Sequence, residues 1–449
     1  MTSRQVLDLL RRYESRNVTF IEREGSWPIV WKRAKGVHVW DAEGRKYLDL
    51  TAAFGVAAAG HANPRVVRAG QKQMATLLHA MGDVHPHALK AKLARELSRI
   101  TFERWHETVE KIRRARGETD LVVFHPSGAS ARTIFCNSGF EAVEAALKTA
   151  KLATGRAGVI AFEGAYHGAG YGALNATHRD HFRAPFRDQL AEFGRFVPFP
   201  TRRDNLARTE EKIRRAFQRQ PVGAVLIEPV QARGGINVPP PEFLRLLRRL
   251  CDEHGSLLIL DEIYTGFGRT GTWFACEHSG VVPDLICLGK ALAGGFPLSA
   301  CVGRADVMDA AWPESNGEAI HTSTFLGHPV GCAMALAQIE EVRRLKLPER
   351  SQRLGALLRD ELNRVDPPNV KLVARAAGLM AGLELLRHDG SPATPEALDV
   401  IKRMLHRGFI LLPEGEYSNV ISFTPPLTIT PAQLRRAVRA LKGELWRSA

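Results

Sequence analysis

Three short apolar runs in the middle of the chain each end in an ionisable side chain, and they constrain the fold more than any other feature. They are residues 224–227 before Glu228, residues 257–260 before Asp261, and residues 285–288 before Gly289 and Lys290. Runs of this length, bounded by Gly and Pro, are typical of strands that are buried on both faces of a mostly parallel sheet. Because ligands bind at the carboxyl ends of such strands, we expect an α/β fold in which Asp261 and Lys290 share one site.

A lysine and an aspartate at neighbouring strand ends are suited to pyridoxal chemistry. Lys290 would form a Schiff base, which requires an amine that is neutral for part of the time. Asp261 would keep a proton on the ring nitrogen, so that the ring withdraws electrons. Each residue alone has a plainer interpretation, since a lone lysine is usually solvated and an aspartate after a strand often caps a helix. The hypothesis therefore depends on the motifs around the pair.

A second motif predicts a cradle for a phosphate group. The strand RTIFCN runs into Ser138, Gly139 and Phe140, and the helix that follows ends at Gly155. The first N–H groups of a helix are unpaired and lie at its positive end, so they stabilise an anion. Serine is also a common helix cap, so the Ser-Gly pair alone would be weak support for a phosphate site.

Five blocks of the sequence resemble signature blocks of the class III aminotransferases, which are pyridoxal-phosphate enzymes of fold type I. The blocks are FCNSGFEAVEAALKTAKLATGR, AYHG, DEIYTGFGRTG, LGKALAGGFPLSA and TSTFLGHPVG, and they occur in the family's order. The resemblance implies a large domain with a mostly parallel, seven-stranded sheet and a smaller α+β domain built from both termini. The expected divisions are 1–60 for an amino-terminal segment that packs with the small domain, 61–330 for the large cofactor-binding domain and 331–449 for the small domain.

The resemblance also implies roles for individual residues. Lys290 forms the internal aldimine with pyridoxal 5'-phosphate and then moves a proton between substrate and cofactor, while Asp261 holds the pyridinium. Tyr166 stacks on the ring, although a buried loop tyrosine is the alternative for that residue. In the family a threonine of the neighbouring subunit, here Thr324, binds the phosphate, so we expect a homodimer or a dimer of dimers with shared active sites. The expected cofactor-binding residues are Ser138, Gly139, Phe140, Tyr166, His167, Asp261, Ile263, Lys290 and Thr324.

The sequence departs from the ornithine- and 4-aminobutyrate-type members of that family on the substrate side. In those members a glutamate pairs with an arginine, which is released to bind the carboxylate of 2-oxoglutarate or glutamate. Arg233 stands at the place of the glutamate and Ser422 at the place of the arginine, so this switch cannot operate here. Tyr264 stands where those members commonly have a glutamine. Either Arg233 or a nearby residue such as Arg375 holds a substrate carboxylate, or Arg233 pairs with a structural carboxylate in a neutral pocket.

The amino-terminal region contributes two further candidates. Strands are predicted at residues 28–31, 37–40 and 47–50, and the resemblance places Phe54 and Val56, which follow them, at the substrate entrance. A purely structural role in a hairpin or turn is an equal alternative for Phe54 and Val56. Residues 103–130 are rich in charge and are predicted to be an inserted helix and loop.

These observations predict an aminotransferase that moves an amino group from a primary amine or ω-amino acid to a 2-oxo acid. A racemase or epimerase, an aminomutase and a decarboxylase are alternatives, because the same constellation serves all of them and only the pocket decides. A catalytically silent homologue that acts as a binding or scaffold protein is a different class of function. The intact Lys290 and Asp261 argue against it.

The composition excludes some other classes of function. Lys and Arg number 62 against 48 Asp and Glu, a net charge of +14, and the excess includes Arg435, Arg436 and Arg439. No interleaved aromatic stripe accompanies this charge, so we expect no nucleic-acid partner and interpret the basic residues as a solvated face that attracts anionic cofactor and substrate. The six cysteines lack metal-ligand spacing, so we expect no metal and reduced thiols. No long apolar run is present, and we expect a cytoplasmic protein without a membrane partner.

Overall fold

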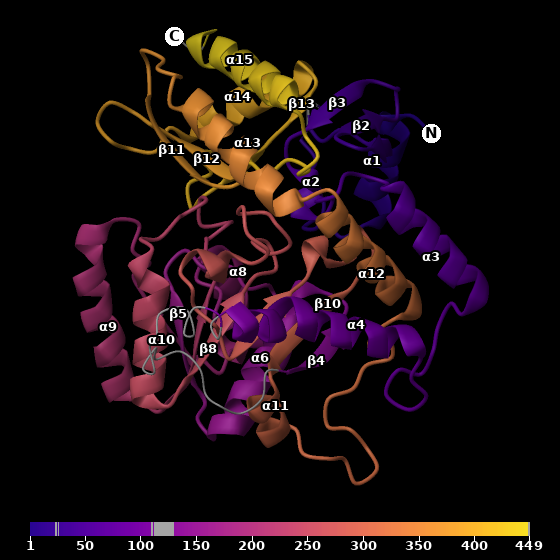
Figure 1. The fold of residues 1–449 in the computed structure, drawn as a ribbon. Coiled ribbons are helices and arrows are strands. Elements are labelled where there is room, and N and C mark those ends of the chain that lie inside the picture. Colours follow the sequence, from indigo (N-terminus) through magenta and orange to yellow (C-terminus); the bar gives the residue numbers. More distant parts are fainter. Residues whose placement is uncertain (23–24, 26, 109–110, 112–129, 448–449) are drawn as a thin grey trace.

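The structure is a computed structural model and describes residues 1–22, 25, 27–108, 111 and 130–447. The predicted insertion at residues 103–130 lies largely outside these residues. Figure 1 shows a large domain built around a central sheet, with a smaller domain of sheets and helices above it. The division at residues 60 and 330 stays a prediction.

The central sheet has seven strands in the order β4-β10-β9-β8-β7-β5-β6. The strands are β4 (Ala131–Cys136), β10 (Ser299–Arg304), β9 (Leu285–Leu288), β8 (Leu257–Asp261), β7 (Val222–Ile227), β5 (Gly158–Phe162) and β6 (Gly194–Val197). Neighbours from β9 to β6 run parallel, and among the described strands of this sheet only β10 is antiparallel to both of its neighbours. The predicted mostly parallel sheet is therefore confirmed. Its three central strands are the three apolar runs of the sequence.

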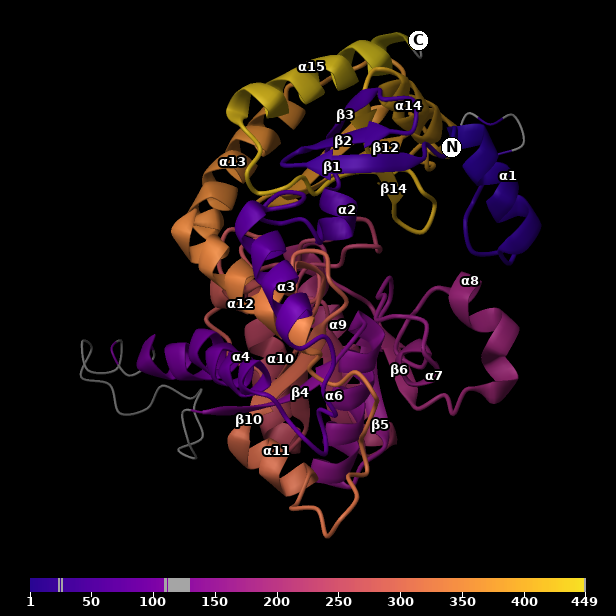
Figure 2. The same cartoon turned by 90° about the vertical axis from the view of Figure 1, so that its right-hand side faces the viewer.

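Helices cover both faces of this sheet, as Figures 1 and 2 show. The helix α6 (Gly139–Thr154) packs its apolar face on alternate strand residues such as Leu226 and Ile259. The helix α10 (Glu242–His254) packs on the other face, against residues such as Val225 and Leu258. Because both faces are buried, the strands need apolar residues at every position, and this explains why their sequences do not alternate. The remaining helices of the large domain are α4 (Ala88–Ser98), α7 (Tyr171–Leu174), α8 (Asp180–Arg183), α9 (Leu206–Arg219) and α11 (Ala305–Ala311).

The small domain contains two four-stranded sheets. The first has the order β1-β2-β3-β13 and joins β1 (Trp31–Lys35), β2 (His38–Asp41) and β3 (Lys46–Asp49) to β13 (Phe409–Ile410). The second has the order β11-β12-β15-β14 and contains β11 (Lys371–Ala377), β12 (Met380–Leu386), β15 (Val420–Phe423) and β14 (Leu412–Glu414). Since β13 pairs in parallel with β3, the amino-terminal segment and the carboxyl-terminal region share one sheet.

The first strand differs from the prediction. It was expected at residues 28–31, but β1 spans Trp31–Lys35, and its side chains are mostly exposed. Three of its five residues are Lys or Arg, which belong on an exposed edge strand and give no apolar signal to locate it. The sequence WPIVW at residues 27–31 is more apolar, and for this reason the predicted strand begins three residues before β1 does.

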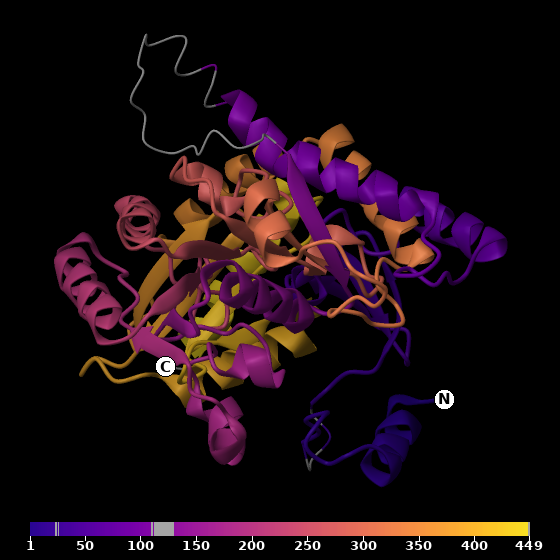
Figure 3. The same cartoon turned by 90° about the horizontal axis from the view of Figure 1, so that it is seen from below.

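Long helices connect and cover the domains. The helix α3 (Pro64–Thr76) packs against α12 (Pro329–Arg344), which leads into α13 (Leu347–Leu362) of the small domain. Met334 of α12 packs closely on Gly70 of α3, because a Cβ added to Gly70 would lie 2.8 Å from Met334 Sδ. The other helices are α1 (Ser3–Tyr13), α2 (Ala52–Gly55), α14 (Thr394–His406) and α15 (Pro431–Arg447), and α1 lies at the edge of the molecule (Figures 2 and 3). Within the described residues, no helix is both long and apolar enough to span a membrane.

Candidate active site

The carboxyl ends of the central strands and the start of α6 enclose one pocket of about 330 Å³, which we call the Lys290 pocket. It lies where β7, β8 and β9 end, as expected for ligand sites in parallel sheets. Its lining includes Gly139, Phe140, Tyr166, His167, Glu228, Arg233, Asp261, Ile263, Tyr264 and Lys290. The structure thus brings together most of the residues that the sequence singled out, from segments that are far apart along the chain.

Lys290 follows β9 directly and is held in an unusual conformation. Its φ angle is +27°, outside the range that most side chains adopt. Its Nζ lies 4.2 Å from the centroid of the Tyr264 ring. Burial lowers the pKa of Lys290, although Asp261 and Glu228 nearby oppose this effect. A lowered pKa increases the neutral fraction of the amine, which is the form that attacks a carbonyl carbon.

Asp261, which lines the pocket, is held by hydrogen bonds. Its Oδ2 lies 2.8 Å from His167 Nδ1, and its Oδ1 accepts a hydrogen bond from the Ile263 N–H at 3.1 Å. Both Asp261 and His167 are buried, and the Thr177 hydroxyl accepts a hydrogen bond from the His167 N–H. A carboxylate with so many fixed neighbours can present one orientation to a cationic ring nitrogen.

The start of α6 offers free hydrogen-bond donors to an anion. The N–H groups of Asn137 and Ser138 are not among them, because both donate to Glu141 Oε2, at 2.7 and 2.9 Å. The Ser138 hydroxyl is buried, and it has no hydrogen-bond partner in the described part of the chain. The N–H groups that open a helix also lack partners within the helix. A buried hydroxyl without a partner beside such donors fits a phosphate group, as pyridoxal phosphate would supply.

Glycines accommodate the large side chain of Phe140 in this turn. A Cβ on Gly168 would lie 2.3 Å from Phe140 Cβ, and a Cβ on Gly170 would lie 2.5 Å from Phe140 Cδ2. The AYHGAG segment must therefore pack tightly over the turn. The contact fixes the segment that carries Tyr166 and His167 relative to the start of α6.

Glu228 joins two loops of the pocket. Its Oε1 accepts a hydrogen bond from the Tyr166 N–H and its Oε2 one from the Ala232 N–H, both at 3.0 Å. Burial raises the pKa of Glu228, although the two N–H groups and His167 oppose this effect. Glu228 therefore positions Tyr166 on one side and the loop of Arg233 on the other.

Arg233 lies on the aromatic side of the pocket. Its guanidinium carbon is 5.2 Å from the centroid of the Tyr166 ring and 5.8 Å from that of Phe182. Among the described residues it forms no ion pair with a carboxylate, and its Nε is buried without a hydrogen-bond partner. Arg375, in contrast, donates to Glu384 Oε2 at 2.7 Å and to the Gly235 carbonyl oxygen at 2.9 Å. Arg233 is the more available of the two arginines.

Five predicted residues do not line the Lys290 pocket, namely Ser138, Phe54, Val56, Ser422 and Thr324. Phe54 is half-exposed in α2, and Val56 follows it. The Ser422 hydroxyl is buried and donates to the Leu412 carbonyl oxygen at 3.0 Å. Thr324 is exposed in the segment before α12. Its neighbour Thr322 forms a hydrogen bond with Asp83.

Sequence reasoning missed Glu414, which lies at the end of β14. The Gly415 N–H donates to the Arg233 carbonyl oxygen at 3.1 Å, so Glu414 adjoins the Arg233 loop. Glu414 is 6% exposed, and burial raises its pKa to about 7, while Arg233 and Lys290 act in the opposite direction. A single glutamate at the end of a short strand carries no motif, so no sequence pattern indicated Glu414.

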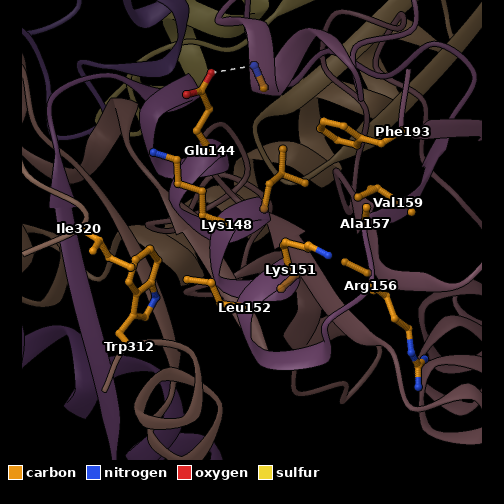
Figure 4. Close-up of a pocket in the computed structure, with 16 residues that line it drawn as sticks. Glu144, Lys148, Lys151, Leu152, Arg156, Ala157, Val159, Phe193, Trp312 and Ile320 are labelled. Atoms are coloured by element: carbon orange, nitrogen blue, oxygen red, sulfur yellow. Dashed lines mark hydrogen bonds between the residues drawn. The ribbon is translucent and has the colours of Figure 1, made fainter. Parts of the chain in front are cut away.

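A separate apolar pocket, the α6 pocket, is lined by residues from the middle and end of α6 (Figure 4). Its side chains include Leu147, Phe193, Trp312 and Ile320, and Glu144 accepts a hydrogen bond from the Gly172 N–H at 3.0 Å. None of the predicted site residues belongs to its lining within the described chain. The residues predicted for the chemistry therefore gather at the Lys290 pocket and not at the α6 pocket.

Comparisons with known proteins agree with this geometry. The family model "Aminotransferase class-III" matches residues 20–445. The chain is 36% identical to the 5-aminovalerate aminotransferase DavT of Pseudomonas aeruginosa, and the match covers 92% of each chain. It is 35% identical to the acetylornithine aminotransferase of Methanosarcina mazei, and that match covers 93% of this chain and 92% of the relative. A structure of the ornithine aminotransferase from Toxoplasma gondii, described with partial occupancy of PLP at its active site, has a TM-score of 0.80 and 29% identity over 99% of this chain and 95% of that one.

Proposed function

Because the chain belongs to the class III aminotransferases, which use pyridoxal phosphate, we propose that it moves the terminal amino group of an ω-amino acid to a 2-oxo acid. The observation that carries this proposal is one pocket that holds Lys290, the Asp261–His167 pair and an unpaired arginine. The family accounts for the first two features. Arg233 is the feature that selects a donor with a carboxylate.

Pyridoxal phosphate, when bound, supplies a ring that withdraws electrons from the substrate carbon. Lys290 would supply the amine that attaches the cofactor and would move a proton at the reacting carbon. Asp261, oriented by His167, holds the proton on the ring nitrogen. Gly139 and Phe140 of the pocket lining, with the buried Ser138 hydroxyl, would hold the phosphate at the start of α6, and Tyr166 would cover the ring.

Arg233 would bind the carboxylate of the amino donor and of the oxo-acid. A guanidinium binds a carboxylate through two parallel hydrogen bonds, and a buried charge without a counter-ion is costly. The rings of Tyr166 and Phe182 lie beside Arg233 and restrict its position. The substrate carboxylate would thus supply the partner that the described protein residues do not.

Glu414 would limit which substrates are accepted. Its carboxyl group is buried beside the Arg233 loop, and among the described residues it has no hydrogen bond or ion pair. A second negative charge on the substrate would lie near this group, so we expect donors with one carboxylate to be preferred over dicarboxylates.

The assembly and location follow from the same proposal. Thr324 lies outside the Lys290 pocket of its own chain, and we assign it to the phosphate site of a neighbouring copy in a homodimer or a dimer of dimers. The six cysteines are all buried and free, which suits a reducing compartment, so we place the enzyme in the cytoplasm.

The first test is the absorbance spectrum of the purified holoenzyme with single amino donors and no oxo-acid. With 5-aminovalerate or 4-aminobutyrate we expect the visible band of the resting enzyme to give way to the near-ultraviolet band of the aminated cofactor. A visible band that persists while an amino acid loses its chirality or releases carbon dioxide would contradict amino transfer.

The second test replaces Arg233 and compares two donors that differ only in the carboxylate. In Arg233→Ala the Michaelis constant for 5-aminovalerate should rise about 10- to 100-fold, because a charged hydrogen-bonded pair is lost. The constant for pentylamine should not rise. Arg375→Gln is the matched control, since Arg375 is already paired with Glu384. Equal effects of Arg233→Ala on both donors would exclude the assigned role.

A further inference from the structure

The small domain contains a cavity of about 520 Å³ that shares no lining residue with the Lys290 pocket. We call it the basic cavity. It lies between the β2–β3 hairpin, the start of β13 and α15, and its lining consists of His38, Lys46, Tyr47, Leu48, Arg407, Gly408, Phe409, Arg436, Arg439 and Ala440. Figure 1 shows β3, β13 and α15 side by side at the top of the molecule.

The lining of this cavity is strongly positive. Four of its side chains are Lys or Arg, and none is Asp or Glu. Arg407 donates to Glu444 Oε1 at 2.8 Å, but Lys46, Arg436 and Arg439 have no ion pair in the described part of the chain. Burial lowers the pKa of His38, and the nearby charges of Lys46 and Arg436 lower it further. Like charges that converge without a counter-ion repel one another, and an anion between them would relieve this repulsion.

The backbone frame holds these side chains in place. The Leu48 N–H donates to the Gly408 carbonyl oxygen at 2.8 Å, which locks the Arg407 turn to β3. Gly408 has a φ angle of +84°, which favours glycine and allows this tight turn after α14. The guanidinium carbon of Arg436 lies 5.4 Å from the centroid of the Phe409 ring. The cations therefore come from three segments that the fold fixes relative to one another.

We propose that the basic cavity binds a small polyanion with at least two phosphate groups. Three unpaired cations exceed what a single carboxylate neutralises, and guanidinium groups match phosphate oxygens with paired hydrogen bonds. The volume lies within the range of small-molecule sites, about 300–1,000 Å³. The cations line one hollow, whereas nucleic-acid-binding proteins commonly spread them over a whole face or along a helix. Arg435 supports this distinction, because it stands next to Arg436 but forms a salt bridge with Glu361 at 3.3 Å.

Titration calorimetry of the holoenzyme with inorganic tripolyphosphate tests the proposal. The holoenzyme is used because its cofactor already fills the phosphate site of the Lys290 pocket. Binding should be saturable at low salt and about 100-fold weaker in the double variant Arg436→Gln/Arg439→Gln, at about tenfold for each lost charged contact. Arg435→Gln should bind as tightly as the unchanged protein, and all of these proteins should retain aminotransferase activity.

Three results would overturn the proposal. The first is tripolyphosphate binding that the double variant leaves unchanged. The second is sulfate binding of equal affinity, which would mean an adventitious ion only. The third is an oligonucleotide that binds more tightly than tripolyphosphate and is weakened equally by Arg435→Gln, which would indicate an extended nucleic-acid surface. If the double variant does not fold, acetylation of Lys46 in the unchanged holoenzyme tests the same site. Tripolyphosphate should protect this exposed lysine from acetylation. A lack of protection would exclude the site.

Discussion

The two halves of the Lys290 pocket are built differently. On the cofactor side, Asp261 and Lys290 stand at the ends of buried central strands, and Asp261 is fixed by His167 and Ile263. On the side proposed for the substrate, Arg233 stands in a loop, and Glu414, which adjoins this loop but does not line the pocket, ends a three-residue strand. Neither has an ion pair among the described residues.

In the proposed function, the fixed groups carry out the chemistry and the groups in the loop select the substrate. Groups that hold and protonate a cofactor must keep one geometry, and strand ends within a packed sheet supply it. Groups that select a substrate can change with a loop while the sheet stays the same. The four predictions below test this division, from the largest expected effect to the smallest.

Replacement of Lys290 should abolish the reaction. In Lys290→Ala both the attaching amine and the proton carrier are lost, and turnover should fall at least about 10,000-fold. Turnover is measured by the oxo-acid-dependent consumption of the amino donor. Lys148→Ala, in the α6 pocket, is the control and should behave like the unchanged protein. Activity within tenfold of normal in Lys290→Ala would refute its role.

Asp261→Asn should lower the turnover number by about 100- to 1,000-fold, because an amide cannot hold a proton on the ring nitrogen. The Michaelis constants should change much less, which separates lost chemistry from lost binding. Asp309→Asn breaks an exposed pair with Arg132 and is the control. If both variants lose activity equally, the effect of Asp261→Asn is structural.

Gly55→Ala should disturb the contact between Tyr264 and Lys290. A Cβ on Gly55 would lie 2.8 Å from Tyr264 Cε1, so the ring must move, and we expect about a tenfold loss of turnover. Gly44→Ala is a matched control, because Gly44 has nearly the same φ angle, +85° against +82°, and a Cβ there meets nothing within 4 Å. If Gly44→Ala and Gly55→Ala lose turnover equally, backbone strain is the cause and the contact with Tyr264 is not.

Glu414→Gln should change how stability depends on pH. Burial raises the pKa of Glu414 to about 7, so the folded chain binds this proton more tightly than the unfolded chain does. The resulting stabilisation is complete below about pH 4.5 and is lost as the pH rises through about 7. Between pH 5 and 8.5, thermal melts should therefore show the variant gaining about 1–3 kcal/mol relative to the unchanged protein. The exposed neighbour Glu416→Gln should show no such trend, and a trend shared by both variants would contradict the assignment.

The cofactor side could be predicted from the sequence because its signal is local. An apolar run followed by an ionisable residue fixes both a buried strand and the edge where that residue lies, and parallel neighbours align these edges. The same logic predicted the phosphate cradle before α6. The substrate side lacks such a signal, since the burial of Glu414 and the pairing of Arg375 with Glu384 depend on packing between distant segments. The exposed strand β1 was misplaced for a related reason, because an edge strand needs no apolar pattern.

The pairing of β3 with β13 has a consequence for how the protein is made. The strands β1, β2 and β3 leave the ribosome first, but their sheet is completed only when Phe409 and Ile410 have been synthesised. All strands of the central sheet lie between these two points in the sequence, so the large domain can fold while the amino-terminal hairpin still has an unpaired edge. During that interval β3 exposes a row of free N–H and C=O groups, which is the kind of edge that aggregating chains and chaperones recognise.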